Sequence, residues 1–300
     1  MNVIEISCPA KTFIVGEYAV LDGGSAIVLN TSPRFVFRIK KQSKAKFIDF
    51  HENSPAGQWI RKNPQDFQSV QIESVKNSLF QGGLGFSSAQ FNTVYAYSFI
   101  LRQGHIDHIK PQDVWKSYRN LCFEGFKPSG ADITTQWIGG VGIFEQDPFH
   151  VESLTFYFPE LECLVLSTGE SFPTYDYLKN FQTSDVSQLK EISEWTVNAM
   201  KKKDKDQFIS GINNYRKALI KKNYVTEKSK DILRRLEKIK ALQAFKSCGA
   251  MGAETLVIFY NKQDDEEVRE AVSFLKIIAD TSQLTYGVEF HKLTKKTEVL

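Results

Sequence analysis

A glycine-rich segment followed by two serines is the part of the sequence best suited to bind an anion. It reads Gln81-Gly82-Gly83-Leu84-Gly85-Phe86-Ser87-Ser88-Ala89 and leads into an apolar, helix-like stretch. Glycine lets a ligand approach the main chain, and the first N–H groups of a helix lack internal partners. The segment therefore predicts either a phosphate site, with a serine able to ligate Mg²⁺, or a tight turn with a serine cap. It is not a Walker A loop, because no lysine follows the glycines.

A second segment, Lys127-Pro128-Ser129-Gly130-Ala131-Asp132, places one carboxylate just after a turn. Such an aspartate can act as a general base for a hydroxyl group or as a metal ligand. Taken alone, an aspartate after glycine is most often a helix cap. The segment therefore leaves both interpretations open.

Two further segments combine small and charged residues. Residues 247–254 read Ser-Cys-Gly-Ala-Met-Gly-Ala-Glu, which alone is typical of a helix end and a tight turn. Residues 9–24 read Pro-Ala-Lys-Thr-Phe-Ile-Val-Gly-Glu-Tyr-Ala-Val-Leu-Asp-Gly-Gly, where Lys11 and Glu17 flank a short strand. Neither segment predicts chemistry by itself.

In their order along the chain, the four segments resemble the motifs of the GHMP kinases, the family of galactokinase, homoserine kinase, mevalonate kinase and phosphomevalonate kinase. The match extends from Pro9 to Glu254. The resemblance implies an α+β fold with two domains: an N-terminal ribosomal-protein-like α+β domain, residues 1–155, and a ferredoxin-like C-terminal domain, residues 156–300. It also implies Mg²⁺ and ATP as cofactors, with the acceptor bound in a cleft between the domains.

The resemblance assigns roles by position. Catalysis falls to Asp132, as base or electrostatic partner of the acceptor, and to Lys11 beside it. The residues assigned to binding of the ATP phosphates are Gly82, Gly83, Gly85, Ser87 and Ser88. The residues assigned to binding of the acceptor substrate are Glu17, Tyr18, Ser129, Gly249 and Ala250. Metal binding falls to Ser87 and to Glu124, the only acidic residue between Asp113 and Asp132.

The sequence departs from the family pattern at several positions. Ala10 replaces a usual glycine, and Phe86 stands where the motif has its first serine. Met251 and Ala253 replace glycines in the segment 247–254, which corresponds to the third motif of the family. Bulkier side chains there predict a more crowded loop, and a catalytically weak relative of the family is one alternative.

The acceptor is predicted from smaller signatures. The stretch from Gly16 to Gly24 and the third motif look like phosphomevalonate kinases. The sequence Pro128-Ser129-Gly130-x-Asp132, with Gly139-Gly140 after it, looks more like mevalonate kinases. The preferred reading is phosphorylation of phosphomevalonate by ATP, with mevalonate or another small-molecule acceptor as the alternative.

Composition excludes several other classes. The 300 residues are 42% hydrophobic and 24% charged, which is ordinary for a globular protein. The net charge of +3 is too small to argue for nucleic acid. The four cysteines are scattered along the chain, so neither zinc binding nor a disulfide framework is expected. Free thiols are typical of a reducing compartment, so we expect a cytoplasmic location. No signal peptide or membrane segment is expected.

A basic region provides the non-enzyme alternative. Residues 181–246 contain 16 Lys or Arg and 8 Asp or Glu, a net charge of +8. Such a region fits a nucleic-acid-binding module, solvated helix faces, or a surface that steers anionic ligands. Solvated faces are the preferred reading, so no nucleic-acid partner is expected. The oligomeric state is left open.

Hydrophobic patterns predict mixed helices and strands. Expected strands are residues 3–6, 11–15, 26–29, 35–39, 163–167, 255–260 and 288–293. Expected helices are residues 87–101, 113–123, several within 184–245, and 264–279. Strands and helices do not alternate strictly, which favours the α+β class.

Overall fold

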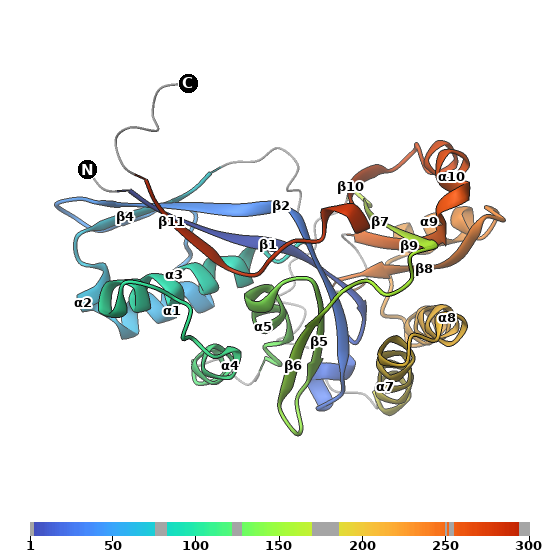
Figure 1. Ribbon diagram of the computed structural model, residues 1–300, viewed down its shortest axis with the longest axis horizontal. Helices are drawn as coiled ribbons and strands as arrows, with labels where there is room; N and C mark the ends of the chain where they lie inside the picture. The colour runs from blue at the N-terminus through green and yellow to red at the C-terminus, as the bar shows by residue number, and fades with distance from the viewer. Residues whose placement is uncertain are drawn as a thin grey trace.

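Two mostly antiparallel sheets lie side by side with helices packed against them, as the computed structural model shows (Figure 1). The structure describes residues 3–75, 83–121, 128–169, 186–249, 251 and 255–293. Gly82, Glu124, Ala250 and Ala253 lie outside the described residues. The α+β class predicted from the sequence is confirmed.

The first sheet is built on a long hairpin. Its strand order is β11-β1-β2-β4-β3, with β5 on β2 and β6 on β5, and only the β3–β4 pair is parallel. The strands are β1 (Val3–Val15), β2 (Ala26–Lys41), β3 (Lys46–Phe47), β4 (Val70–Ser74), β5 (Val141–Glu145), β6 (His150–Leu154) and β11 (Glu289–Leu293). The short strands predicted at 3–6 and 11–15 are one strand. Register shifts after Cys8 and Phe13 interrupt its regular pairing with β2.

Helices cover the first sheet on the side shown below it in Figure 1. They are α1 (Pro55–Lys62), α2 (Pro64–Phe67), α3 (Phe86–Gln103), α4 (Pro111–Arg119) and α5 (Ala131–Ile138). Helix α1 was not predicted from the sequence, although Ser54 caps it by accepting from Gly57 N and Pro55 begins it. Most of α3 is buried. Its burial on nearly all sides explains why the sequence lacks a clear polar face there.

The second sheet has the strand order β10-β7-β9-β8. Its strands are β7 (Leu161–Ser167), β8 (Leu242–Cys248), β9 (Thr255–Asn261) and β10 (Lys276–Asp280), and its helices are α7 (Ser187–Lys201), α8 (Lys205–Lys221), α9 (Glu227–Leu236) and α10 (Asp265–Ala271). Short 3-10 turns are η1 (Ala19–Asp22), η3 (Lys262–Asp264) and η4 (Thr281–Gln283).

Two predicted helical segments are partly wrong in this half. The helical pattern predicted up to Phe245 ends at Leu236, and the helix predicted to Ala279 ends at Ala271. Residues 242–248 and 276–280 instead pair with β9 and β7. Short apolar runs fit a buried strand as well as a helix, and tertiary pairing decided between them.

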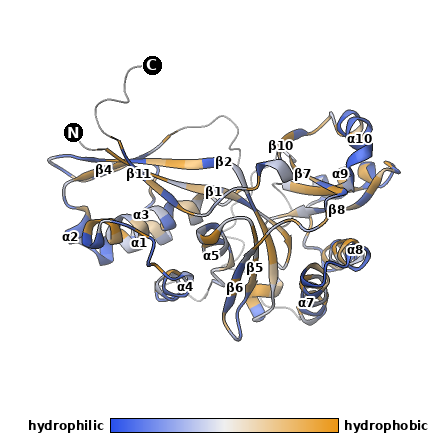
Figure 2. Cartoon of the chain, in the orientation of Figure 1, coloured by the Kyte–Doolittle hydropathy of each residue, from blue (hydrophilic) through white to orange (hydrophobic). Residues whose placement is uncertain are grey.

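One hydrophobic core joins the two sheets. The cluster that contains Ile6 of β1 also contains Leu164 of β7 and Leu256 of β9. Figure 2 shows apolar residues gathered in the central strands, whereas α10 is largely hydrophilic. The last strand, β11, returns to pair with β1, so residues after 156 contribute to the first sheet. The domain boundary at residue 155 stays a prediction.

Among the described helices, none combines the length and the apolar character needed to cross a membrane.

Candidate active site

The glycine-rich segment forms the start of helix α3. Gly83 and Gly85 have φ values of 70° and 87°, in the left-handed region that favours glycine. Gly85 is the N-cap residue, and the first helical bond runs from Ala89 N to Gly85 O at 2.9 Å. The N–H groups before Ala89 belong to the first turn, where a helix has no internal acceptors for them. The predicted serine cap is wrong, and the geometry fits an anion.

The two serines of this turn differ in what their hydroxyls do. Ser88 is buried, and its Oγ donates to Gly85 O at 2.9 Å. Ser87 is exposed at the helix start. Of the two, only Ser87 therefore presents its side chain to solvent beside the free N–H groups. Its role in Mg²⁺ binding stays a prediction.

Phe86 does not crowd this turn from within the loop. Its ring lies 5.4 Å from that of Phe35 and 5.8 Å from that of Phe37, on strand β2. The departure from the family motif is thus absorbed by packing against the sheet.

Lys11 lies directly against the glycine-rich turn. Its backbone N–H donates to Leu84 O at 2.8 Å. A Cβ built on Gly85 would lie 2.6 Å from Lys11 Cγ, so no side chain fits at that position. Lys11 Nζ lies 4.8 Å from the centroid of the Phe13 ring. The strand that carries the lysine and the turn that offers N–H groups are therefore in contact.

Asp132 stands in the first turn of α5, half-buried. The turn before it is fixed by Trp115, whose Nε1 donates to Ser129 O at 2.7 Å. A Cβ on Gly130 would lie 2.8 Å from Trp115 Cδ1, and Gly130 has φ 76°. Ser129 Oγ accepts from Ala131 N at 3.3 Å. Ser129 thus shapes the turn, and its predicted contact with substrate stays a prediction.

The negative charge of Asp132 affects the pKa of the buried phenol group of Tyr118. Burial raises the pKa of Tyr118 well above its ordinary value, and the negative charge of Asp132 raises it further. Within the described part of the chain, neither Asp132 nor Lys11 makes an ion pair. Lys11 at the glycine-rich turn and Asp132 at the start of α5 are therefore not paired with each other.

Glu17 is buried and paired with a residue that the sequence analysis did not single out. Lys246 of β8 is fully buried, and its Nζ lies 2.6 Å from Glu17 Oε1 and 3.5 Å from Cys248 Sγ. Burial raises the pKa of Glu17, an effect that Lys246 opposes. Glu17 Oε2 is also buried, with no hydrogen-bond partner among the described residues. The pair joins the end of β1 to the second sheet.

Tyr18 connects the same two regions. Its Oη accepts from Met251 N at 2.9 Å, and its ring stacks on Tyr224 at 4.5 Å. Met251 O in turn accepts from Thr226 N at 2.9 Å. The segment 9–24 therefore contacts the segment 247–254 through Tyr18 and Met251. The second of these segments also includes Gly249, whose φ is 88°. The predicted contacts of Glu17, Tyr18 and Gly249 with the acceptor stay predictions.

The cysteines of this region are buried thiols. Burial raises the pKa of Cys248 to about 11 and that of Cys8 to about 12. Both are protonated at neutral pH and poorly suited to act as nucleophiles.

Metal ligands are sparse in the described part of the chain. No group of three or more His, Cys, Asp or Glu side chains gathers there. The rings of His105 and His108 lie 4.8 Å apart. The helix start at Gly85 fits an anion, whereas the predicted metal ligand Glu124 lies outside the described residues.

The basic region forms helix surfaces on which many cations are engaged. Lys201 pairs with Glu145 at 2.7 Å and Glu152 at 3.1 Å. Arg234 pairs with Asp231. These contacts favour solvated helix faces over a nucleic-acid groove.

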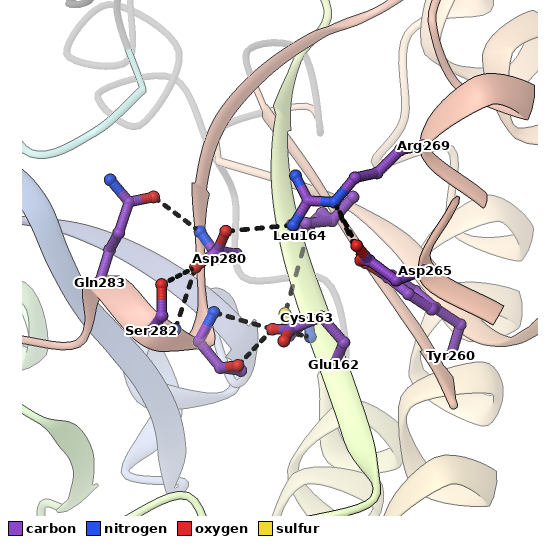
Figure 3. A network of polar contacts seen from close by, with 10 residues as sticks. Glu162, Cys163, Leu164, Tyr260, Asp265, Arg269, Asp280, Ser282 and Gln283 are labelled. Carbon is purple, nitrogen blue, oxygen red and sulfur yellow. Dashed lines mark hydrogen bonds and ion pairs between the residues drawn. The ribbon is translucent and has the colours of Figure 1, made fainter. Parts of the chain in front are cut away.

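A second polar cluster connects helix α10 with strands β7, β9 and β10 of the second sheet (Figure 3). Arg269 contacts both oxygens of Asp265 at 2.9 Å and Oδ2 of Asp280 at 3.2 Å. Tyr260 Oη donates to Asp265 Oδ1, and Glu162 Oε1 accepts from Thr281 N at 2.9 Å. Donors and acceptors satisfy one another here, so this cluster is structural.

Solved enzymes share the fold. The phosphomevalonate kinase of Streptococcus pneumoniae, in complex with phosphomevalonate and AMPPNP, matches with a TM-score of 0.73 and 15% identity over 92% of this chain and 98% of that chain. The mevalonate kinase of Methanococcus jannaschii matches with a TM-score of 0.63 and 16% identity over 94% and 98%. The mevalonate diphosphate decarboxylase of Enterococcus faecalis matches with a TM-score of 0.70 and 12% identity over 98% and 100%.

No family profile matches the sequence, and no curated protein matches it. The chain has the fold of the GHMP kinases, as its motifs predicted. At these identities the likeness establishes the fold alone.

Proposed function

We propose that the protein is an ATP-dependent kinase of the mevalonate pathway that phosphorylates phosphomevalonate. One observation carries the proposal: the glycine-lined helix start is in direct contact with Lys11 and with α5, the helix whose first turn holds the half-buried Asp132. Lys11 packs on Gly85, and the helix of Asp132 donates a hydrogen bond to Gly85 O. An anion site and a candidate base on helices in contact with each other are an arrangement suited to phosphoryl transfer.

The residues would divide the work by chemistry. The N–H groups of the first turn of α3 would bind phosphate oxygens, and Ser87 would help to hold Mg²⁺. ATP would supply the phosphoryl group that is transferred. Lys11 would stabilise negative charge that develops on that group. Asp132 would orient the acceptor oxygen and accept a proton where the acceptor carries one.

Mevalonate is the second candidate acceptor. The turn Pro128-Ser129-Gly130 before Asp132 and the later Gly139-Gly140 favour it. A mevalonate diphosphate decarboxylase that binds ATP shares this fold, so release of CO₂ has to be measured together with phosphorylation. Another GHMP-type acceptor, or a catalytically weak protein, completes the alternatives.

The decisive experiment is ADP release with Mg-ATP and a panel of acceptors: mevalonate, phosphomevalonate, mevalonate diphosphate, homoserine and galactose. We expect release with phosphomevalonate, with a new phosphorus signal in the product and no CO₂. No release above background with any acceptor, from a folded sample, would overturn the proposal. ADP together with CO₂ from mevalonate diphosphate would replace the kinase assignment with a decarboxylase.

A further inference from the structure

One buried amide connects three segments of the candidate site. Gln136 lies one helical turn after Asp132 in α5, and its side chain is fully buried. Its Nε2 donates to Pro9 O at 2.7 Å and to Gly85 O at 3.2 Å. Pro9 stands two residues before Lys11 on β1. The amide thus joins the helix of the candidate base, the strand of the lysine and the glycine-rich turn.

The contact with Gly85 acts on the residue that begins helix α3. Gly85 O also accepts from Ser88 Oγ and Ala89 N, both at 2.9 Å. These two donors belong to α3 itself, whereas Gln136 donates from α5. The orientation of the Gly85 peptide group is therefore set from two helices, and so is the direction of the N–H groups that follow it.

Stability alone gives a poor account of this side chain. Gln136 Oε1 is buried and has no hydrogen-bond partner among the described residues. A buried acceptor without a hydrogen bond destabilises the folded state, and an apolar side chain of similar shape would avoid that cost. The two donated bonds offset this cost, and what they hold is the relative placement of three segments.

We propose that Gln136 is a positioning residue for phosphoryl transfer. It holds the anion-binding turn and the strand of Lys11 at a fixed position relative to Asp132. Residues four apart on a helix lie on the same face, about 5–6 Å apart at Cβ, so Gln136 reaches Gly85 from beside Asp132. Displacing a reacting group by about 1 Å can reduce the rate by about 10²-fold. This inference rests on the proposed function.

The chain offers a matched control. Asn92 of α3 is also a fully buried amide, and its Nδ2 donates to Ile133 O of α5 at 3.0 Å. Its Oδ1 is likewise buried without a partner among the described residues. Both amides thus bridge α5 to a neighbouring segment, but the hydrogen bonds to Gly85 and Pro9 come from Gln136.

The test compares Gln136→Met with Asn92→Leu. Methionine keeps the length and flexibility of glutamine and removes the donor. We expect both variants to melt at lower temperature than wild type. Only Gln136→Met should show about tenfold faster amide hydrogen exchange in peptides covering residues 9–13 and 83–89, measured without nucleotide. It should also lose about 10²-fold in kcat with phosphomevalonate.

Three results would overturn the proposal. One is wild-type exchange in both peptides of Gln136→Met. Another is the same acceleration of exchange in Asn92→Leu, which would reveal general destabilisation. The third is wild-type kcat and KM in a Gln136→Met protein that exchanges faster. Gln136→Asn, which keeps an amide but shortens its reach, serves as the second variant should methionine prevent folding, with the same outcomes.

The exchange measurement separates this inference from the proposed function. If the wild-type protein neither binds Mg-ATP in calorimetry nor releases ADP, the proposed function fails and no catalytic positioning can be claimed. If wild type turns over and Gln136→Met behaves like Asn92→Leu in both exchange and turnover, the proposed function stands and the positioning role fails.

Discussion

Two clusters of charged residues in this molecule are built in opposite ways. Where α10 meets the end of β10, Arg269 pairs with both Asp265 and Asp280, whose oxygens also accept hydrogen bonds from Tyr260 and Ser282 (Figure 3). By contrast, Lys11 on β1 and Asp132 on α5 make no ion pair among the described residues. The buried side chain of Glu17 pairs with Lys246, and its Oε2 has no hydrogen-bond partner among the described residues.

The difference separates structural charge from charge available to a ligand. An exposed ion pair contributes about 0–1 kcal/mol and needs no further partner. Unpaired charges beside free helix N–H groups retain the capacity to bind a substrate. The comparison therefore predicts which substitutions reduce turnover and which reduce only stability.

Asp132→Asn should produce the largest effect on turnover. Asparagine keeps the size of the side chain but loses the negative charge that would orient the acceptor and cannot accept a proton, and loss of a positioned base lowers the rate by about 10²–10⁴-fold. We expect the loss in kcat, with KM for ATP near wild type. ADP release and the melting temperature are measured on one preparation, with Asp265→Asn as control from the paired network. An Asp132→Asn protein that melts lower but turns over normally would show that Asp132 is only a helix cap.

Lys246→Met should produce the largest effect on stability. Removing one partner of a buried pair leaves the other charge uncompensated, at a cost of about 3–5 kcal/mol. Adding Glu17→Gln removes that charge, so the double variant should recover most of the free energy of unfolding measured in urea. A single variant within about 1 kcal/mol of wild type would mean that Glu17 is not charged in the folded protein.

Ser87→Ala should weaken Mg²⁺-dependent ATP binding by about tenfold, the loss expected for one hydrogen bond or ligand to a charged group. Ser129→Ala should change it less, because the Ser129 hydroxyl accepts from Ala131 N in the turn before α5. Isothermal calorimetry with Mg-ATP measures both. Equal affinity of wild type and Ser87→Ala for Mg-ATP would count against the assignment of the nucleotide site to the start of α3.

Asp280→Asn should produce the smallest effect, about 1 kcal/mol or less in stability because solvent screens the pair with Arg269. Partial burial raises the pKa of Asp280, but hydrogen bonds from Ser282 and Arg269 outweigh it and hold the pKa below its ordinary 3.8. The stabilisation is therefore present above pH 3.8 and is lost as the pH falls through the folded value. Melting temperatures of wild type and variant should converge in that acidic range, with kcat at neutral pH unchanged. A difference that persists or grows in acid would contradict the ion-pair account.

The candidate site was only partly readable from the sequence. Two patterns are recognisable in the sequence: glycines followed by serines, and an aspartate after Ser-Gly. Few residue types allow those turns and that chemistry. Gln136 and Lys246 carry no such mark, since an isolated glutamine or lysine in a sequence is usually solvated. Their burial and their partners on distant segments follow from the sheet pairing and could not be inferred from neighbours in the chain.

The sequence by itself determined the α+β class, the order of the four motifs and the turns at Gly85 and Gly130, because these depend on local conformational preference. Tertiary structure decided that residues 242–248 and 276–280 are strands, and that the final strand returns to β1. It also decided that Glu17 faces Lys246, and that Gln136 reaches Gly85. Hydrogen bonds and charge pairs between distant segments exist only once the hydrophobic core has brought those segments together, and local sequence patterns carry no record of such distances.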